Sequence, residues 1–162
     1  MLAALALLPL LALPTVQAQS GDLPCSGTIS GRTVNGDVKV PRGLSCTLVN
    51  TRVNGDVEVE RGASLIVRNT RIDGDIGTDD GFTRIGVVGS VVNGDIQAEK
   101  GGSVNVEDVR VDGDIKLEEN TGTLRVTRVT VNGDLKCGDN RRAPTGGRNQ
   151  VNGDREGQCS RL

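Results

Sequence analysis

The sequence predicts an all-β fold, a single-domain parallel β-helix (β-solenoid) of about seven coils with 19 to 20 residues per coil. Three observations predict it. A four-residue motif recurs at a nearly constant spacing, apolar residues recur at fixed distances from that motif, and large side chains for an ordinary core are scarce. The chain has one aromatic residue, Phe82, among 162 residues, so Val, Ile and Leu have to form the core.

The motif has the form Val/Ile-Asn/Asp-Gly-Asp and occurs seven times between positions 34 and 154. Its glycines are separated by 19, 19, 20, 19, 20 and 20 residues. These motif glycines are Gly36, Gly55, Gly74, Gly94, Gly113, Gly133 and Gly153. A period of this length predicts that each copy marks one coil, which buries its apolar side chains only by stacking on its neighbours.

Apolar residues form five columns when the copies are aligned on the motif glycine, and they alternate as in strands. Two residues before the glycine lie Val34, Val53, Ile72, Val92, Val111, Val131 and Val151; two after it lie Val38, Val57, Ile76, Ile96, Ile115 and Leu135. The other columns are Ile29, Leu48, Val67, Val87, Val106 and Val126 (seven before), Leu65, Ile85, Val104 and Leu124 (nine before), and Val40, Val59, Thr78, Ala98, Leu117 and Cys137 (four after).

Glycines also separate the expected strands elsewhere in the coil, which predicts two to three short strands per coil. This second group is Gly43, Gly62, Gly81, Gly101 and Gly122. A sandwich of hairpins is the alternative, because Asn-Gly is a strong hairpin signal. A hairpin array, however, does not require the same residue type at every nineteenth or twentieth position.

Residues 1–18 are almost wholly apolar and end in Val16-Gln17-Ala18, a small-x-small pattern that predicts a signal peptide cleaved after Ala18. The solenoid domain would then span residues 19–162. A membrane anchor is the alternative, but Pro9 and Pro14 interrupt the segment, which barely reaches the ~20 residues of a span. We therefore expect an exported protein, periplasmic or extracellular, with no membrane span after cleavage, although a basic residue before the apolar stretch is missing.

Four cysteines in an exported chain predict disulfides. Cys25 and Cys46 lie 21 residues apart and Cys137 and Cys159 lie 22 apart, each close to one coil, which favours these two pairs. They would pin the first and last coils. A metal site is disfavoured because the chain has no His and no Cys-x-x-Cys pair.

The last coil is expected to be a polar cap that protects a strand edge. Where earlier coils have Leu and Val, the stretch from Gly138 to Gln150 offers Asn140, Arg141, Arg142, Pro144 and Gly146, and Arg155 follows the final motif.

The aspartates that end the motif form the clearest polar column. They are Asp37, Asp56, Asp75, Asp95, Asp114, Asp134 and Asp154. We expect each to accept backbone N–H bonds at the turn, helped by Arg52, Arg71 and Arg110. A row of Ca²⁺ ions between coils is the alternative, but the glycine-rich nonapeptide of calcium-binding β-rolls does not occur.

A second polar column precedes the motif glycine and is expected to form a ladder of hydrogen bonds along the rod. It consists of Asn35, Asn54, Asp73, Asn93, Asp112, Asn132 and Asn152. Because Asn, Asp and Gly all tolerate a left-handed backbone, the motif is expected to turn the chain at a tight corner.

No catalytic, cofactor-binding or metal-ligating residue is predicted. An enzyme acting on polysaccharide is a remote alternative, because the Asp repeats in every coil whereas a catalytic acid–base pair should be singular. An ice-binding Thr array is disfavoured too, since the column four before the glycine is irregular. That column reads Arg32, Thr51, Thr70, Ser90, Val109 and Val129.

Charge patterning disfavours nucleic acid as a partner: 19 basic and 21 acidic residues are interleaved without a basic block. The repeated Val-x-Gly-Asp-Val/Ile unit over residues 27–137 resembles the core of bactofilin-like, polymer-forming proteins. The resemblance implies end-to-end filament assembly. This chain departs from those cytoplasmic proteins in its expected signal peptide, four cysteines and polar last coil, and no site residue is carried over.

The sequence thus predicts a non-enzymatic exported solenoid that acts as a structural or surface and envelope-associated module, whose partner would be an envelope or extracellular protein or glycan. The alternative is a calcium-stabilised solenoid that binds extracellular glycan or protein.

Overall fold

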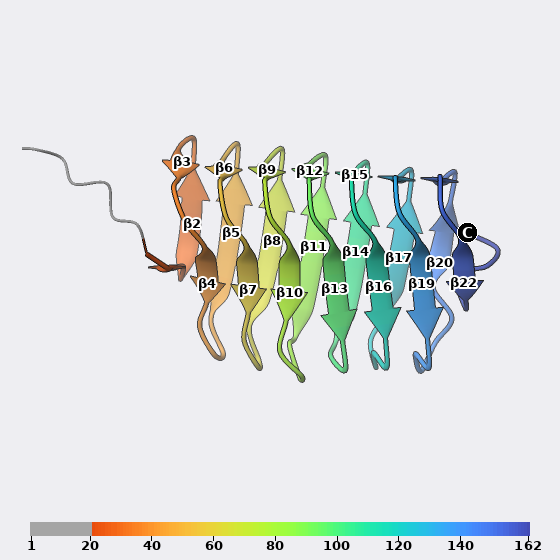
Figure 1. Cartoon of the computed structure of the whole chain (residues 1–162). Coiled ribbons are helices and arrows are strands. Elements are labelled where there is room, and N and C mark those ends of the chain that lie inside the picture. The colour runs from red at the N-terminus through yellow and green to blue at the C-terminus, as the bar shows by residue number, and fades with distance from the viewer. Residues whose placement is uncertain (1–20) are drawn as a thin grey trace, which may run out of the picture.

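The computed structural model describes residues 21–162, which form 22 short strands wound into a rod of about seven coils (Figure 1). The described residues contain no helix, and hence none that could span a membrane. The predicted signal peptide, residues 1–18, lies outside the described residues. The predicted β-solenoid is confirmed.

Three parallel sheets, A, B and C, make the three faces of the rod. Sheet A contains β1 (Leu23–Pro24), β4 (Val38–Val40), β7 (Val57–Val59), β10 (Ile76–Thr78), β13 (Ile96–Glu99), β16 (Ile115–Glu118), β19 (Leu135–Gly138) and β22 (Arg155–Gly157). Sheet B contains β2 (Gly27–Ser30), β5 (Ser45–Val49), β8 (Ser64–Arg68), β11 (Arg84–Val88), β14 (Ser103–Glu107), β17 (Leu124–Thr127) and β20 (Thr145–Gly147). Sheet C contains β3 (Thr33–Val34), β6 (Arg52–Val53), β9 (Arg71–Ile72), β12 (Val91–Val92), β15 (Arg110–Val111), β18 (Thr130–Val131) and β21 (Gln150–Val151).

Each coil therefore has three strands and stacks on the next in register with the motif. Val38 pairs with Val57 in sheet A, for example, and Val34 pairs with Val53 in sheet C. All pairs among the described strands are parallel, which rules out the alternative sandwich of hairpins. Within each sheet, neighbouring strands in Figure 1 accordingly belong to successive coils.

The core is the interior of the rod, and the five predicted columns line it. The column two after the motif glycine is completely buried, and Val151 and Thr78 are the only column members that are half-buried. Phe82 is buried as well and adds the one aromatic ring. Strands this short bury their apolar side chains because the neighbouring coils cover both edges.

The chain turns at three corners, named here A–B, B–C and C–A for the sheets they join. The motif occupies the C–A corner. The expected left-handed backbone there is wrong: of the seven motif glycines only Gly36 has a φ in the positive range, at 147°, and no Asn or Asp of the motif does. Left-handed residues instead mark the B–C corner, at Gly31, Asn50, Asn69, Gly89, Asp108, Arg128 and Arg148.

The A–B corner changes its form halfway along the rod. In the first three coils the left-handed residue is a glycine, Gly43, Gly62 or Gly81, with φ of 71°, 72° and 82°. In the next three it is Lys100, Glu119 or Asp139, with φ of 51°, 52° and 51°. Gly101 and Gly122 are therefore not turn glycines, as had been expected, and they allow close packing against Phe82 and Ser103.

Candidate functional site

The column of motif aspartates binds successive coils together. One carboxylate oxygen of each aspartate, Oδ1, accepts a hydrogen bond from the backbone N–H of the aspartate in the next coil, at 2.7 to 2.9 Å in all six steps from Asp37 to Asp154. The expectation that these carboxylates accept backbone N–H groups is confirmed. Like charges in a row are thereby offset by a charge-assisted bond at every step.

The motif glycine is required by this bond. A Cβ on Gly74 would lie 1.9 Å from Oδ1 of Asp56 and 2.8 Å from the carbonyl oxygen of Gly55. The other five later motif glycines show the same approach, between 1.9 and 2.2 Å from the preceding Oδ1. The glycine and the aspartate of the motif therefore act together: the glycine has no side chain, and this leaves room for the aspartate carboxylate of the preceding coil.

The three arginines that were expected to help this column serve the neighbouring one instead. Arg52 and Arg71 both bind Asp73, at 2.6 and 2.9 Å, and Arg110 binds Asp112. The expected pairing with the motif aspartates is wrong because these arginines lie on sheet C, where their side chains run beside the Asn/Asp column. Although partial burial raises the pKa of Asp73, the hydrogen bonds from Arg71 and Arg52 outweigh it and hold that pKa below its usual value.

The Asn/Asp column forms the predicted ladder along the outside of the rod. The Nδ2 of Asn54 donates to Asn35 at 2.7 Å, and that of Asn93 donates to Asp73 at 2.9 Å. The same bond joins Asn132 to Asp112 at 2.8 Å and Asn152 to Asn132 at 3.0 Å. Four of the six steps along the column thus carry this bond, and the buried Oδ1 of Asn93 has no hydrogen-bond partner among the described residues.

The free oxygens of the aspartate column meet side chains of sheet A. Lys136 lies 2.9 Å from Oδ2 of Asp134, and the amide of Gln97 donates to Oδ2 of Asp95 at 3.2 Å. The backbone N–H of Asp154 and then Lys136 lower the pKa of Asp134. Within residues 21–162 no group of three or more His, Cys, Asp or Glu side chains is placed to hold a metal ion.

A ladder of hydroxyl groups lies inside the B–C corner of the first coils. Thr51, Thr70 and Ser90 are 3% to 4% exposed, and each hydroxyl donates to the carbonyl two residues earlier. The backbone N–H of Thr51 donates to the hydroxyl of Thr70, and that of Thr70 donates to Ser90. The column four residues before the motif glycine, considered above as an outward Thr array, thus faces inward here. In later coils it continues as buried Val109 and Val129.

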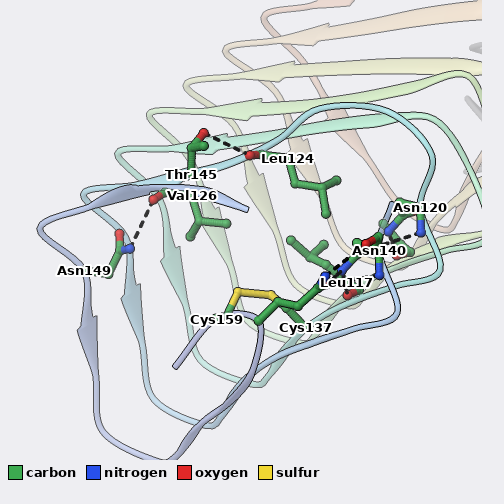
Figure 2. The surroundings of a disulfide bond; sticks show 11 residues. Leu117, Asn120, Leu124, Val126, Cys137, Asn140, Thr145, Asn149 and Cys159 are labelled. Atoms are coloured by element: carbon green, nitrogen blue, oxygen red, sulfur yellow. Dashed lines mark hydrogen bonds between the residues drawn. A yellow bond between two sulfur atoms is a disulfide. The ribbon is translucent and has the colours of Figure 1, made fainter. Parts of the chain in front are cut away.

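A second internal ladder, of amides, lies at the A–B corner of the later coils, and sequence reasoning missed it (Figure 2). Asn120 is fully buried; its Oδ1 accepts from the N–H of Gly101 at 3.0 Å and its Nδ2 donates to the carbonyl of Ala98 at 2.8 Å. Asn140 repeats the arrangement one coil later: its Oδ1 accepts from the N–H of Asn120 and its Nδ2 donates to the carbonyl of Leu117. Gln158 ends the ladder, because its Oε1 accepts from Nδ2 of Asn140 and its Nε2 donates to the backbone carbonyl of Asn140. The available signal was the 20-residue spacing of the two asparagines.

Both predicted disulfides are present. Cys25 pairs with Cys46 and Cys137 with Cys159, with Cα atoms 5.5 and 5.2 Å apart. Figure 2 shows the second bond inside the end of the rod, near the amide ladder. Each bond includes a cysteine in a core column, because Cys46 pairs in register with Leu65 and Cys137 with Leu117.

Both ends of the rod differ from the prediction. Leu23 pairs with Val38, so Gly21-Asp22-Leu23 is an eighth, shortened copy of the motif, hidden by a spacing of only 15 residues from Gly36. The last coil is more than a polar cap, since it contributes a strand to each of the three sheets. Asn140 and Pro144 are buried, whereas Arg141 and Arg142 are exposed as expected.

Comparisons of the chain with protein-family models, with curated protein sequences and with solved structures give no significant match.

Proposed function

We propose that the chain is an exported structural rod, a non-catalytic module of the cell surface or envelope. The observation that carries this proposal is the use of the motif: every Asp from Asp37 to Asp134 holds the next coil through a backbone N–H, so the most repeated polar group maintains the stack. A catalytic carboxylate would need a different environment from its neighbours. Two disulfides favour an oxidising compartment, periplasmic or extracellular.

The end of the rod supports a discrete module more than a filament. After the last strand, β22, the chain folds back over the end: Cys159 is buried and disulfide-bonded, and Leu162 packs against the core. End-to-end assembly, which the resemblance to bactofilin-like proteins implies, would require this segment to leave.

Export is tested by expressing the full chain and a chain that lacks residues 1–18 in a host with a periplasm. We expect the full chain in the periplasm or medium, with all four cysteines resistant to alkylation until they are reduced. The shortened chain should stay in the cytoplasm with reactive thiols. Reactive thiols and a cytoplasmic location for the full chain would contradict the proposal.

The calcium-stabilised alternative is tested by thermal unfolding in EDTA and in millimolar Ca²⁺. Because one oxygen of each motif aspartate already accepts a backbone bond, we expect the same Tm in both conditions. A site filled at 100 times its Kd would add about 2.7 kcal/mol and raise the Tm clearly. Such a rise would replace the structural interpretation of the aspartate column with a metal-binding one.

A further inference from the structure

The outer face of sheet B carries a charge distribution that differs from that of sheet A. The strands of sheet B contain Arg68, Arg84 and Arg125 but a single acidic residue, Glu107. In sheet A, Glu58, Glu99, Glu118 and Glu156 accompany the lysines, and a motif aspartate stands before each strand from β4 onward. The arginines come from separate coils, which is why no basic block is visible in the sequence.

Two adjoining hollows cross sheet B in the later coils and share Arg125 and Thr145. We call them together the sheet B groove. The first has a volume of about 400 Å³ and is lined by Arg125, Thr127, Arg128, Thr145, Gly146, Gly147 and Arg148. The second has a volume of about 310 Å³ and is lined by Arg84, Ser103, Val104, Asn105, Thr123, Leu124, Arg125 and Thr145. No acidic residue lines either hollow.

Three of the four groove arginines carry uncompensated charge. Arg84, Arg125 and Arg148 are exposed and have no ion pair within residues 21–162. Arg128 differs, because it binds Asp108 at 2.6 Å and also binds Glu107, which fixes its position at the rim. By contrast, the exposed arginines of sheet C are paired with Asp73 or Asp112, so the charges on sheet C are compensated where three of those in the groove are not.

The groove also offers polar groups besides its arginines. The hydroxyl of Thr127, which lines it, is buried and has no hydrogen-bond partner in the described part of the chain. The hydroxyls of Ser103 and Thr123, which hydrogen-bond to each other at 3.3 Å across neighbouring coils, add neutral polar atoms beside Arg125. A sugar polymer with acidic groups requires both cations and neutral polar groups of this kind.

We propose that the sheet B groove binds an acidic polysaccharide lying along the rod. Coils stack about 4.8 Å apart, so the groove arginines, which span three successive steps, present positive charge over about 15 Å. This spacing suits a chain with repeated carboxylates or sulfates better than one small anion. An open groove across a sheet suits a linear polymer.

Other polyanions and partners fit the groove less well. A single-stranded nucleic acid would be expected to stack bases on aromatic side chains, and the one aromatic ring, Phe82, is buried in the core. A protein partner would be expected to use an apolar anchor. The exposed large apolar side chain of the described residues, Leu44, belongs to the first A–B corner and does not line the groove.

The test measures binding of the purified protein to fluorescently labelled heparin and polygalacturonate, with neutral dextran and single-stranded DNA as comparison probes. We expect salt-sensitive binding to at least one acidic polysaccharide and none to dextran. Replacing both Arg125 and Arg148 with Gln should weaken binding about a hundredfold, because a lost charge-assisted bond corresponds to about tenfold. The matched control replaces Arg32 and Arg42, exposed in the first coils, with Gln and should bind normally.

Several outcomes would overturn the proposal. The first is an equal loss of binding in the two double variants, which would indicate an effect of net charge alone. The second is the absence of binding to either acidic polysaccharide. The third is binding to single-stranded DNA that is as tight as binding to the polysaccharide and depends equally on Arg125. Circular dichroism of each variant establishes that the rod is intact. Polysaccharide binding goes beyond the proposed structural function and is independent of it. A protein that does not bind polysaccharide could still be exported with its thiols oxidised, so the two proposals can fail separately.

Discussion

The first and last halves of the rod place their buried polar groups at opposite corners. In the early coils the B–C corner contains Thr51, Thr70 and Ser90, and the A–B corner is filled by Ala63 and Phe82. In the later coils the B–C corner contains Val109 and Val129, and half-buried Asn149 returns a polar side chain to this column in the last coil. The A–B corner there contains the amide ladder of Asn120 and Asn140.

The exchange shows what a coil needs at a corner. At several corner positions a side-chain oxygen of the next coil accepts from a backbone N–H, as Thr70 does for Thr51 and Asn120 does for Gly101. Either corner can supply this oxygen. A buried polar column is tolerated in a narrow apolar core because every member has its partners in the adjacent coil.

The C–A corner is the same in both halves, and its glycine should therefore be equally sensitive throughout. We expect Gly74→Ala and Gly113→Ala each to reduce the free energy of unfolding by about 3 kcal/mol, because the new Cβ would meet an Asp Oδ1 within 2.0 Å and a carbonyl at 2.8 Å. Urea unfolding of each variant measures this. Gly77→Ala is the control, since a Cβ there meets nothing within 4 Å.

A loss at only one of the two motif positions would show that the halves also differ at the C–A corner. A loss at Gly77 as large as that at Gly74 would indicate that the close approach of the carboxylate is not the cause.

The buried amide ladder should be the more sensitive of the two polar ladders. Asn120→Ala leaves the N–H of Gly101 and the carbonyl of Ala98 without partners in the core, and we expect a cost of about 2 kcal/mol. Chemical unfolding of the variant provides the value. Hydrogen exchange should also locate the loss at the amide of Gly101, and unchanged protection there would argue against the ladder.

The hydroxyl ladder should tolerate the matching change better. Thr70→Val removes the acceptor for the N–H of Thr51, but Val109 and Val129 occupy the same column in later coils, so the volume fits. We expect a cost of about 1 kcal/mol by the same unfolding assay. A cost equal to that of Asn120→Ala would mean that the two corners demand polar groups equally.

The sequence predicted the repeating part of this molecule and missed the parts that occur once or twice. Seven motif copies fixed the coil length, the five core columns and, with the cysteine spacing, both disulfides. Two copies of Asn at a 20-residue spacing, Asn120 and Asn140, were too few to stand out from a polar stretch.

The reason for the motif glycine was also out of reach of the sequence. A glycine next to Asn or Asp suggests a left-handed turn, whereas here it is needed because the carboxylate of another coil lies against it. Likewise, the unpaired groove arginines Arg84, Arg125 and Arg148 are 23 to 64 positions apart in the chain and come together only through the stacking of coils. Contacts between coils depend on which face each side chain takes, and a one-dimensional charge scan does not contain that information.

The smallest expected effect concerns the outer Asn/Asp column, where Asp73 in the early coils and Asp112 in the late ones occupy a position that is Asn in the other coils. The lowered pKa of Asp73 means that its charge stabilises the fold above its usual pKa, and that this contribution is lost as the pH falls through the lowered value. Asp73→Asn should therefore lower the Tm slightly at pH 7, and the difference should shrink as the pH falls through the lowered pKa of Asp73. Thermal unfolding across this range measures it; a difference that persisted in acid would show that Asn simply packs less well beside Arg52 and Arg71.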